Sequence, residues 1–207
     1  MYMTRVQLKR IPAPNIIHGV LSAALPDERN KENECLWRID KLGDRQILIV
    51  VSTKRPDLSY IEKKIGIAND AKEDDGQPLI NKTVEYETFL KKIENDQLWN
   101  FRLCANPVEN KKQDPNDKRG KVYALRTITE QLDWLVKQGE KHGFIVKNCS
   151  VINDSWVVFN DVRIRAITFD GTLSVSDSDA MRLALSHGIG RGKAYGCGLL
   201  TIARVQT

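Results

Sequence analysis

The chain has 207 residues, of which 41% are hydrophobic and 29% charged, with a formal net charge of +5. This composition excludes a disordered chain, and no apolar run approaches the roughly 20 residues that a membrane-spanning helix needs. The excess of positive charge favours a polyanion, most simply nucleic acid, as a partner.

The first half of the chain predicts the element order β-α-β-β-α-β. Residues 2–10 alternate between apolar and polar side chains, which is typical of a half-buried strand. Asn15 is the expected N-cap of the following helix, and Pro26 lies just beyond its end. After the first strand we expect a helix at 15–25, strands at 35–41 and 45–53, a helix at 57–65 and a strand at 82–93.

The second half repeats the same order. Capping-box patterns run from Thr127 to Glu130 and from Ser176 to Asp179, and they mark the starts of two helices. The expected elements are a strand at 98–108, a charged loop at 111–121, a helix at 127–143, strands at 144–152 and 162–175, a helix at 176–188 and a strand at 196–205.

These two halves predict an α+β protein made of two tandem ferredoxin-like (RRM-like) β-α-β-β-α-β domains. We place the first domain at residues 1–95 and the second at 96–207, which gives each about the size of a small domain. The N-terminal residues lack the apolar core of a signal peptide, so we expect a cytoplasmic protein. The cysteines form no C-x-x-C pair, which argues against bound zinc and against a disulfide framework.

The stretch GIGRGKAYGCGLL, residues 188–200, is rich in glycine and carries Arg191 and Lys193. It does not match a P-loop, because His187 stands where the first glycine belongs and Ala194 follows Lys193 in place of Ser or Thr. It also leads from a predicted helix into a strand, the reverse of the order in nucleotide-binding loops. Two interpretations stay open: a helix end with a solvated basic pair, or a backbone nest with two phosphate donors.

His18 differs from the other two histidines. His142 and His187 end predicted helices, where a cation is favourable. His18 lies in the first turn of the helix at 15–25, away from the centre of the apolar face formed by Ile16, Ile17, Val20, Leu21 and Ala24. From the residues alone, it is either a solvated surface histidine or a general acid or base beside a phosphate-attracting helix end.

Basic side chains gather in two further places. Arg163 and Arg165 are two residues apart on a strand and therefore share one face, next to a predicted hairpin turn at Asn160-Asp161. The stretch 109–126 carries more cations than carboxylates; its basic residues are Lys111, Lys112, Lys118, Arg119, Lys121 and Arg126. These side chains are candidates for phosphate contacts, and ordinary solvated surfaces are the alternative.

The sequence as a whole resembles a known family. The stretch GIGRGKAYGCGLLTIA, residues 188–203, resembles the C-terminal signature of CRISPR-associated RNA-processing proteins. MYMTRVQL at the N-terminus and FRLCANPV at residues 101–108 resemble one branch, the CasE endoribonuclease of the type I-E Cascade complex. The resemblance extends over the whole chain and also implies the tandem ferredoxin-like order.

The resemblance implies a function. His18 matches the catalytic histidine in the first helix of the family. The implied reaction needs no metal or cofactor: the ribose 2′-OH attacks the adjacent phosphate of a CRISPR repeat RNA, at the base of its stem-loop, and leaves a 2′,3′-cyclic phosphate and a 5′-OH. The basic hairpin, the basic stretch, Arg191 and Lys193 would hold the RNA. The expected partners are this RNA and other Cascade subunits, with no membrane, and the protein itself is expected to be monomeric.

The sequence departs from the family pattern at two positions. Asn15 stands one turn before His18, where relatives often carry a tyrosine, and Cys104 stands where they often carry an arginine. The second proton-transfer group is therefore open, with Tyr2 or a lysine as candidates. Two other functions remain: an RNA-binding subunit of the same assembly that does not cleave, and a ferredoxin-like regulatory or scaffold protein with incidental positive charge.

Overall fold

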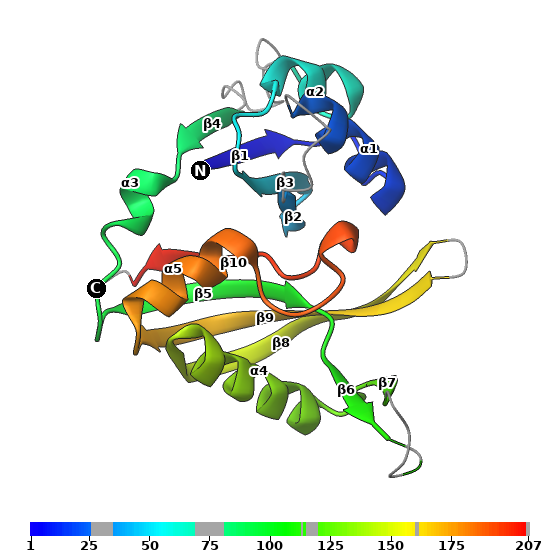
Figure 1. Cartoon of the computed structure of the whole chain (residues 1–207). Coiled ribbons are helices and arrows are strands. Elements are labelled where there is room, and N and C mark those ends of the chain that lie inside the picture. Colours follow the sequence, from blue (N-terminus) through cyan, green and yellow to red (C-terminus); the bar gives the residue numbers. More distant parts are fainter. Residues whose placement is uncertain (26–34, 69–80, 113, 115–119, 160–161, 206–207) are drawn as a thin grey trace.

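The computed structural model describes residues 1–25, 35–68, 81–112, 114, 120–159 and 162–205. Figure 1 shows two layered units stacked on each other. The elements in chain order are β1 (Tyr2–Gln7), α1 (Pro14–Ala24), β2 (Cys35–Leu42), β3 (Arg45–Ser52), α2 (Leu58–Lys64), β4 (Lys82–Glu85), α3 (Glu87–Leu90), β5 (Leu98–Ala105), β6 (Val108–Lys111), β7 (Lys121–Ala124), α4 (Ile128–His142), β8 (Phe144–Phe159), β9 (Val162–Val175), α5 (Ser178–His187), the 3-10 helix η1 (Lys193–Tyr195) and β10 (Leu200–Arg204).

The N-terminal unit is an antiparallel sheet in the order β2-β3-β1-β4, with α1 and α2 on one face. Because side chains alternate along each strand, the apolar ones point to one face and fill the space beneath these helices. Val6, Leu48 and Val50 are fully buried there. They pack in one cluster with Ile17 and Leu21 of α1. The central position of β1, between β3 and β4, is the ferredoxin-like arrangement.

The C-terminal unit repeats this topology with the order β10-β5-β9-β8. Thr127 caps α4 in a reciprocal capping box with Glu130, as the sequence predicts, and Gly143 ends the helix in the left-handed conformation at φ 75°. The predicted α+β class with two ferredoxin-like units is therefore confirmed. The boundary between residues 95 and 96 stays a prediction.

The two units share a continuous interior. Leu36 of β2 and Val51 of β3 belong to the same buried cluster as Phe101, Leu103 and other residues of the C-terminal unit. Trp37, the next residue along β2, faces the opposite way, into the cluster under α1. Strand alternation therefore gives β2 one face for each core, so the N-terminal sheet is buried on both sides.

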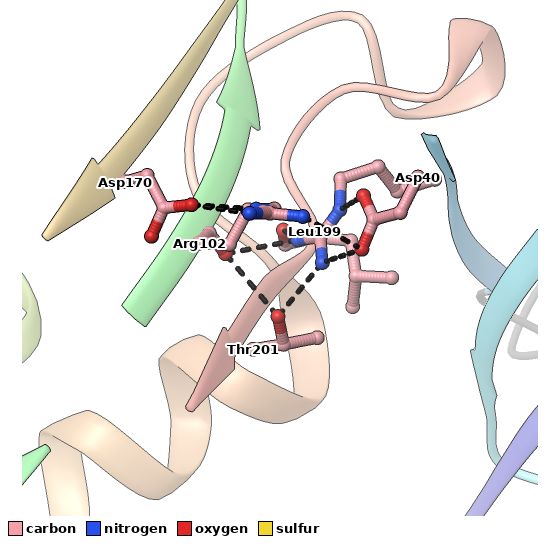
Figure 2. A network of polar contacts seen from close by, with 6 residues as sticks. Asp40, Arg102, Asp170, Leu199 and Thr201 are labelled. Carbon is pink, nitrogen blue, oxygen red and sulfur yellow. Dashed lines mark hydrogen bonds and ion pairs between the residues drawn. The ribbon is translucent and has the colours of Figure 1, made fainter. Parts of the chain in front are cut away.

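Arg38 of β2 crosses the boundary between the units, because its partners come from both of them. Figure 2 shows these partners, Asp40, Arg102, Leu199 and Thr201, gathered around one network of polar contacts. The Arg38 guanidinium bonds both carboxylate oxygens of Asp40, the carbonyls of Arg102 and Leu199 at 2.9 Å each, and Thr201 Oγ1 at 2.8 Å. These contacts use all five N–H donors of a side chain that is only 3% exposed. We call the Arg38 contacts and the glycine-rich loop packed beside them the seam.

Three local predictions are wrong. The helix at 15–25 begins one residue earlier, with Ala13 as N-cap and Pro14 in its first turn, so Asn15 is not the cap. Asp177, not Ser176, caps α5 through its side chain. The strand expected at 82–93 ends at Glu85, because the chain turns into α3. The charged stretch 111–121 lies largely outside the described residues, but its two ends belong to a two-stranded ribbon, β6–β7.

None of the helices in the described segments is both long and apolar enough to cross a membrane.

Candidate functional site

His18 is exposed on the surface of α1. The helix buries Ile17, Val20, Leu21 and Ala24, so His18 points away from the core, as its spacing predicts. Within the described segments its ring makes no hydrogen bond or ion pair with protein. The prediction that Ile16 belongs to the buried face is wrong, because its side chain is 48% exposed. The imidazole is therefore available to a ligand.

The glycine-rich loop is built for close packing and unusual backbone geometry. All five of its glycines have positive φ, between 76° and 91°. A Cβ at Gly196 would lie 2.7 Å from Cζ3 of Trp37, and one at Gly188 would lie 2.8 Å from Cδ2 of Leu36. The glycines therefore let the C-terminal unit approach β2 of the N-terminal unit. This favours packing over a phosphate cradle as the reason for the motif.

The same loop brings its basic pair beside the helix that carries His18. Lys193 begins η1, which lies against α1 and β2. Arg191 is exposed, and its backbone forms an isolated antiparallel β-bridge with Asn106. The amide of Gly198 donates to the carbonyl of Cys104 at 2.6 Å. The glycine-rich loop therefore meets residues 105–107 (the ANP segment), although the two stretches are almost a hundred residues apart in the sequence.

The ribbon β6–β7 continues directly from the ANP segment. Lys111, Lys112 and Lys121 are exposed on it, and Lys111 Nζ lies 2.5 Å from Glu109 Oε1, a carboxylate that raises the pKa of this lysine. Lys118 and Arg119 lie outside the described residues. Arg126 follows the ribbon and is exposed just before the N-cap of α4.

The β8–β9 hairpin extends past the sheet, as Figure 1 shows at the right. Its two arginines share a face, as predicted: the guanidinium carbons of Arg163 and Arg165 lie 4.5 and 6.0 Å from the ring centroid of Trp156. Arg163 is exposed. Arg165 instead pairs with Asp154 and donates from Nη1 to the carbonyl of Leu125 at 3.2 Å. This pairing is the main reason that the pKa of Asp154 lies below its ordinary value.

The predicted site residues are thus linked through neighbouring elements. α1 touches η1, the loop around η1 pairs with Asn106, the ribbon follows two residues later, and Leu125 after the ribbon holds the hairpin through Arg165. Figure 1 shows α1, the hairpin and the ribbon toward the same side of the molecule. The structure therefore arranges one imidazole and several cations along one connected surface.

Sequence reasoning missed two aromatic residues of this surface as functional candidates. Trp156 is 46% exposed on the hairpin, and its outward position could have been read from its alternation with Val157. Tyr195 is half-buried on η1, the element that touches α1, and only the tertiary structure places it there.

Two of the cysteines, Cys35 and Cys149, have thiols that react poorly. Burial raises the pKa of the Cys35 thiol to about 12 and that of Cys149 to about 11, which leaves little reactive thiolate at neutral pH. Among the described residues, no three His, Cys, Asp or Glu side chains converge on a point that could hold a metal ion.

Comparison with known proteins identifies the family. The family model described as "CRISPR associated protein" matches residues 1–204. The chain belongs to this family. The CRISPR-associated endoribonuclease Cse3 of Thermus thermophilus is 25% identical over 97% of this chain and 94% of its own length. The Cascade subunit CasE of Escherichia coli is 31% identical over 50% of this chain and 56% of its own length.

Solved structures of CRISPR-associated proteins share the architecture. A structure of the endoribonuclease Cse3 bound to a 19-nucleotide RNA superposes with a TM-score of 0.75 at 25% identity, covering 98% of this chain and 97% of that one. Cas6e of Escherichia coli gives a TM-score of 0.66 at 20% identity, with 99% of this chain and 100% of that one covered. The tandem ferredoxin-like fold of this family member is therefore shared with both.

Proposed function

We propose that this chain is a metal-independent endoribonuclease that cleaves CRISPR repeat RNA at the base of its stem-loop, stays bound to the mature guide RNA and acts as a cytoplasmic subunit of Cascade. The relative that aligns over nearly the whole chain is named an endoribonuclease, and a solved relative at the same identity carries RNA. A second relative is named a Cascade subunit.

One observation carries the proposal: the single exposed imidazole on α1 lies on a helix that packs against the loop bearing Arg191 and Lys193. A nuclease of this class needs a group that exchanges a proton and cations that hold the phosphate beside it. Here the N-terminal half provides the imidazole and the C-terminal half provides the cations, and the seam fixes the relative position of the two halves.

The reaction follows from the chemistry of RNA. The 2′-OH next to the scissile phosphate loses its proton and attacks phosphorus, and the bond to the 5′-oxygen breaks. The products are a 2′,3′-cyclic phosphate and a 5′-OH end, with the proton returned to the leaving oxygen. His18 takes or returns that proton, and DNA does not react because it lacks the 2′-OH.

Most of the remaining rate acceleration comes from holding the RNA in an in-line geometry. Arg191, Lys193 and the cations of the ribbon and hairpin contact phosphates, so binding falls as salt rises. The second proton-transfer group is not Asn15, which is exposed in the first turn of α1 and does not titrate. Lys193 lies on η1, the element of the C-terminal unit that packs against α1, and is our choice for that role.

An RNA-binding subunit without cleavage is the second candidate. The observation in its favour is Asn15, because this chain has an amide where relatives often have a phenol. In that case the cations would hold the stem-loop and His18 would be a surface histidine.

A cleavage assay decides between the two. The protein is incubated with its cognate repeat RNA in EDTA, and the end groups of the products are determined. We expect a 2′,3′-cyclic phosphate, and we expect His18→Ala to slow cleavage by about 100- to 10,000-fold while RNA binding is retained. His187→Ala is the matched control, because it removes another exposed helical histidine, at the end of α5, and should leave the rate unchanged.

The outcomes separate the candidates. Binding of the RNA by the native protein without any cleavage supports the non-cleaving subunit. Equal rates for His18→Ala and the native protein would rule out this imidazole as the proton-transfer group. A protein that neither binds nor cleaves the RNA would rule out both candidates.

A further inference from the structure

The two arginines on the exposed face of the hairpin have different surroundings. Arg163 is exposed and stacks on Trp156, with no ion pair to any described residue. The side chain of Arg165 is only 15% exposed and is held by three hydrogen bonds, two of which form an ion pair with Asp154. A phosphate can therefore approach Arg163, whereas three of the five N–H donors of Arg165 are already engaged.

Arg165 connects three segments. Its Nε donates to Asp154 Oδ1 at 2.8 Å, and its Nη2 pairs with the other oxygen of the same carboxylate. This joins β9 to β8 as a bidentate pair. Its Nη1 donates to the carbonyl of Leu125 at 3.2 Å, which lies outside the hairpin.

Leu125 is the residue at which the ribbon ends and α4 is about to begin. It is buried, and its amide donates to the carbonyl of Pro107, at the other end of the ribbon. The side-chain amide of Gln131, on the first turns of α4, donates to the same Leu125 carbonyl. A bond from Arg165 to this carbonyl therefore ties the hairpin to the base of the ribbon and to the start of α4.

We propose that Arg165 and Asp154 form a clamp that positions the basic hairpin against the basic ribbon, and that Arg165 is a positioning residue and not a phosphate contact. The clamp fixes the separation between Arg163 on the hairpin and the lysines of the ribbon, Lys111, Lys112 and Lys121. As far as RNA is concerned, this inference rests on the proposed function, since a fixed separation selects a stem-loop of matching width.

Charge strengthens the argument. Asp154 is an exposed carboxylate on the hairpin that bears Arg163 and Arg165, and by itself it would repel RNA. Its presence there is explained by its bond to Arg165. The charge of Arg165 is in turn balanced by Asp154, so the pair as a whole offers little attraction to a phosphate.

The two roles predict effects of opposite sign for Asp154→Asn. If Arg165 contacted phosphate, removing the carboxylate would release a cation and tighten RNA binding. With a clamp, the same change loosens the hairpin and weakens binding by about 2- to 5-fold, the range expected for loss of a partly exposed ion pair. Arg165→Lys should weaken binding similarly, because lysine keeps the charge but cannot make the bidentate and third bonds together.

Arg163→Gln is the matched control on the same strand face. It should lower the slope of log Kobs against log salt by about one unit, as loss of a phosphate contact does. Asp154→Asn and Arg165→Lys should leave that slope unchanged. All variants are compared with the native protein on the cognate repeat stem-loop RNA.

Amide hydrogen exchange on the protein without RNA tests the clamp independently. Amides of β6, β7 and the hairpin should exchange faster in Asp154→Asn and Arg165→Lys but not in Arg163→Gln. Unchanged exchange in the two clamp variants, or tighter RNA binding by Asp154→Asn, would overturn the proposal. Faster exchange in a protein that binds no RNA would confirm the clamp and refute the proposed function.

Discussion

The seam and the β8–β9 hairpin use the same residue types for opposite purposes. At the seam, Arg38 is 3% exposed, and all of its side-chain N–H groups donate hydrogen bonds to protein atoms of the two units. On the hairpin, Arg163 is exposed and stacks on the Trp156 ring, with no ion pair to a residue that the structure describes. An arginine on a strand therefore says little by itself about function, because burial decides whether its donors serve the fold or a ligand.

The glycine-rich loop likewise shows that residue type alone does not reveal function. Its composition resembles a ligand-binding loop, yet Gly188 and Gly196 are required where the chain presses on Leu36 and Trp37. The loop contributes to function indirectly, since it sets η1 against α1. The seam thus sets the relative position of the two units, and the exposed β8–β9 hairpin and β6–β7 ribbon present the positive charge.

The largest stability effect should come from Arg38→Met at the seam. The change leaves the carbonyls of Arg102 and Leu199 without this donor, and among the described residues it leaves Asp40 with only the Arg102 guanidinium as an ion-pair partner, 3.7 Å away. We expect a loss of about 3–5 kcal/mol in unfolding free energy, as for a buried pair that loses one partner. Urea denaturation measures it, with the exposed Arg204→Met as control; equal losses in both variants would mean that the seam is not held by Arg38.

A smaller effect is expected for Gly196→Ala. Alanine at φ 84° costs about 1–2 kcal/mol in backbone strain, and its Cβ meets Trp37 as well. The matched control is Gly43→Ala, which has φ 59° but no atom within 4 Å of its Cβ, so it bears the strain alone. Thermal unfolding of both variants should show the larger loss at Gly196. Equal losses would show that the glycine loop does not press on β2.

The smallest effect concerns the hairpin and pH. Arg165 holds the pKa of Asp154 below its ordinary value of 3.8, so the unfolded chain takes up the proton first as the pH falls. The contribution of the pair is therefore full above that value and is lost as the pH falls through the depressed pKa. Unfolding free energies at several pH values should show a gap between native protein and Asp154→Asn at pH 6 that closes toward pH 2. A gap that widens in acid would contradict the assignment.

Much of the fold could be predicted because the local signals agree with the tertiary structure. Alternation predicted β1 and β5, a hairpin signal between residues 41 and 45 predicted β2 and β3, and the capping box at Thr127 marked the start of α4. The strand expected at 82–93 ends early because Tyr86, the N-cap of α3, stacks on Phe89 of that helix, and the Phe89 ring meets Trp99 edge-on. A propensity for strand gave way there to a packing contact.

The candidate site was predicted in part for a similar reason. His18 was found because helical periodicity alone tells which side of α1 is buried. Arg163 and Arg165 were placed on one face by strand alternation, yet their different surroundings were not visible, since Asp154 and Leu125 approach from other elements. The role of Trp156 as their stacking partner depends on the same cross-strand register.

The sequence by itself determined the two β-α-β-β-α-β units, the outward position of His18 on α1 and the shared face of Arg163 and Arg165 on β9, because these follow from local periodicity. Only the tertiary structure decided that α1 lies against η1, that Arg38 spans both units and that Arg165 is held while Arg163 is exposed. The physical reason is that burial and hydrogen-bond partners come from residues far apart in the chain, whose approach no local pattern encodes.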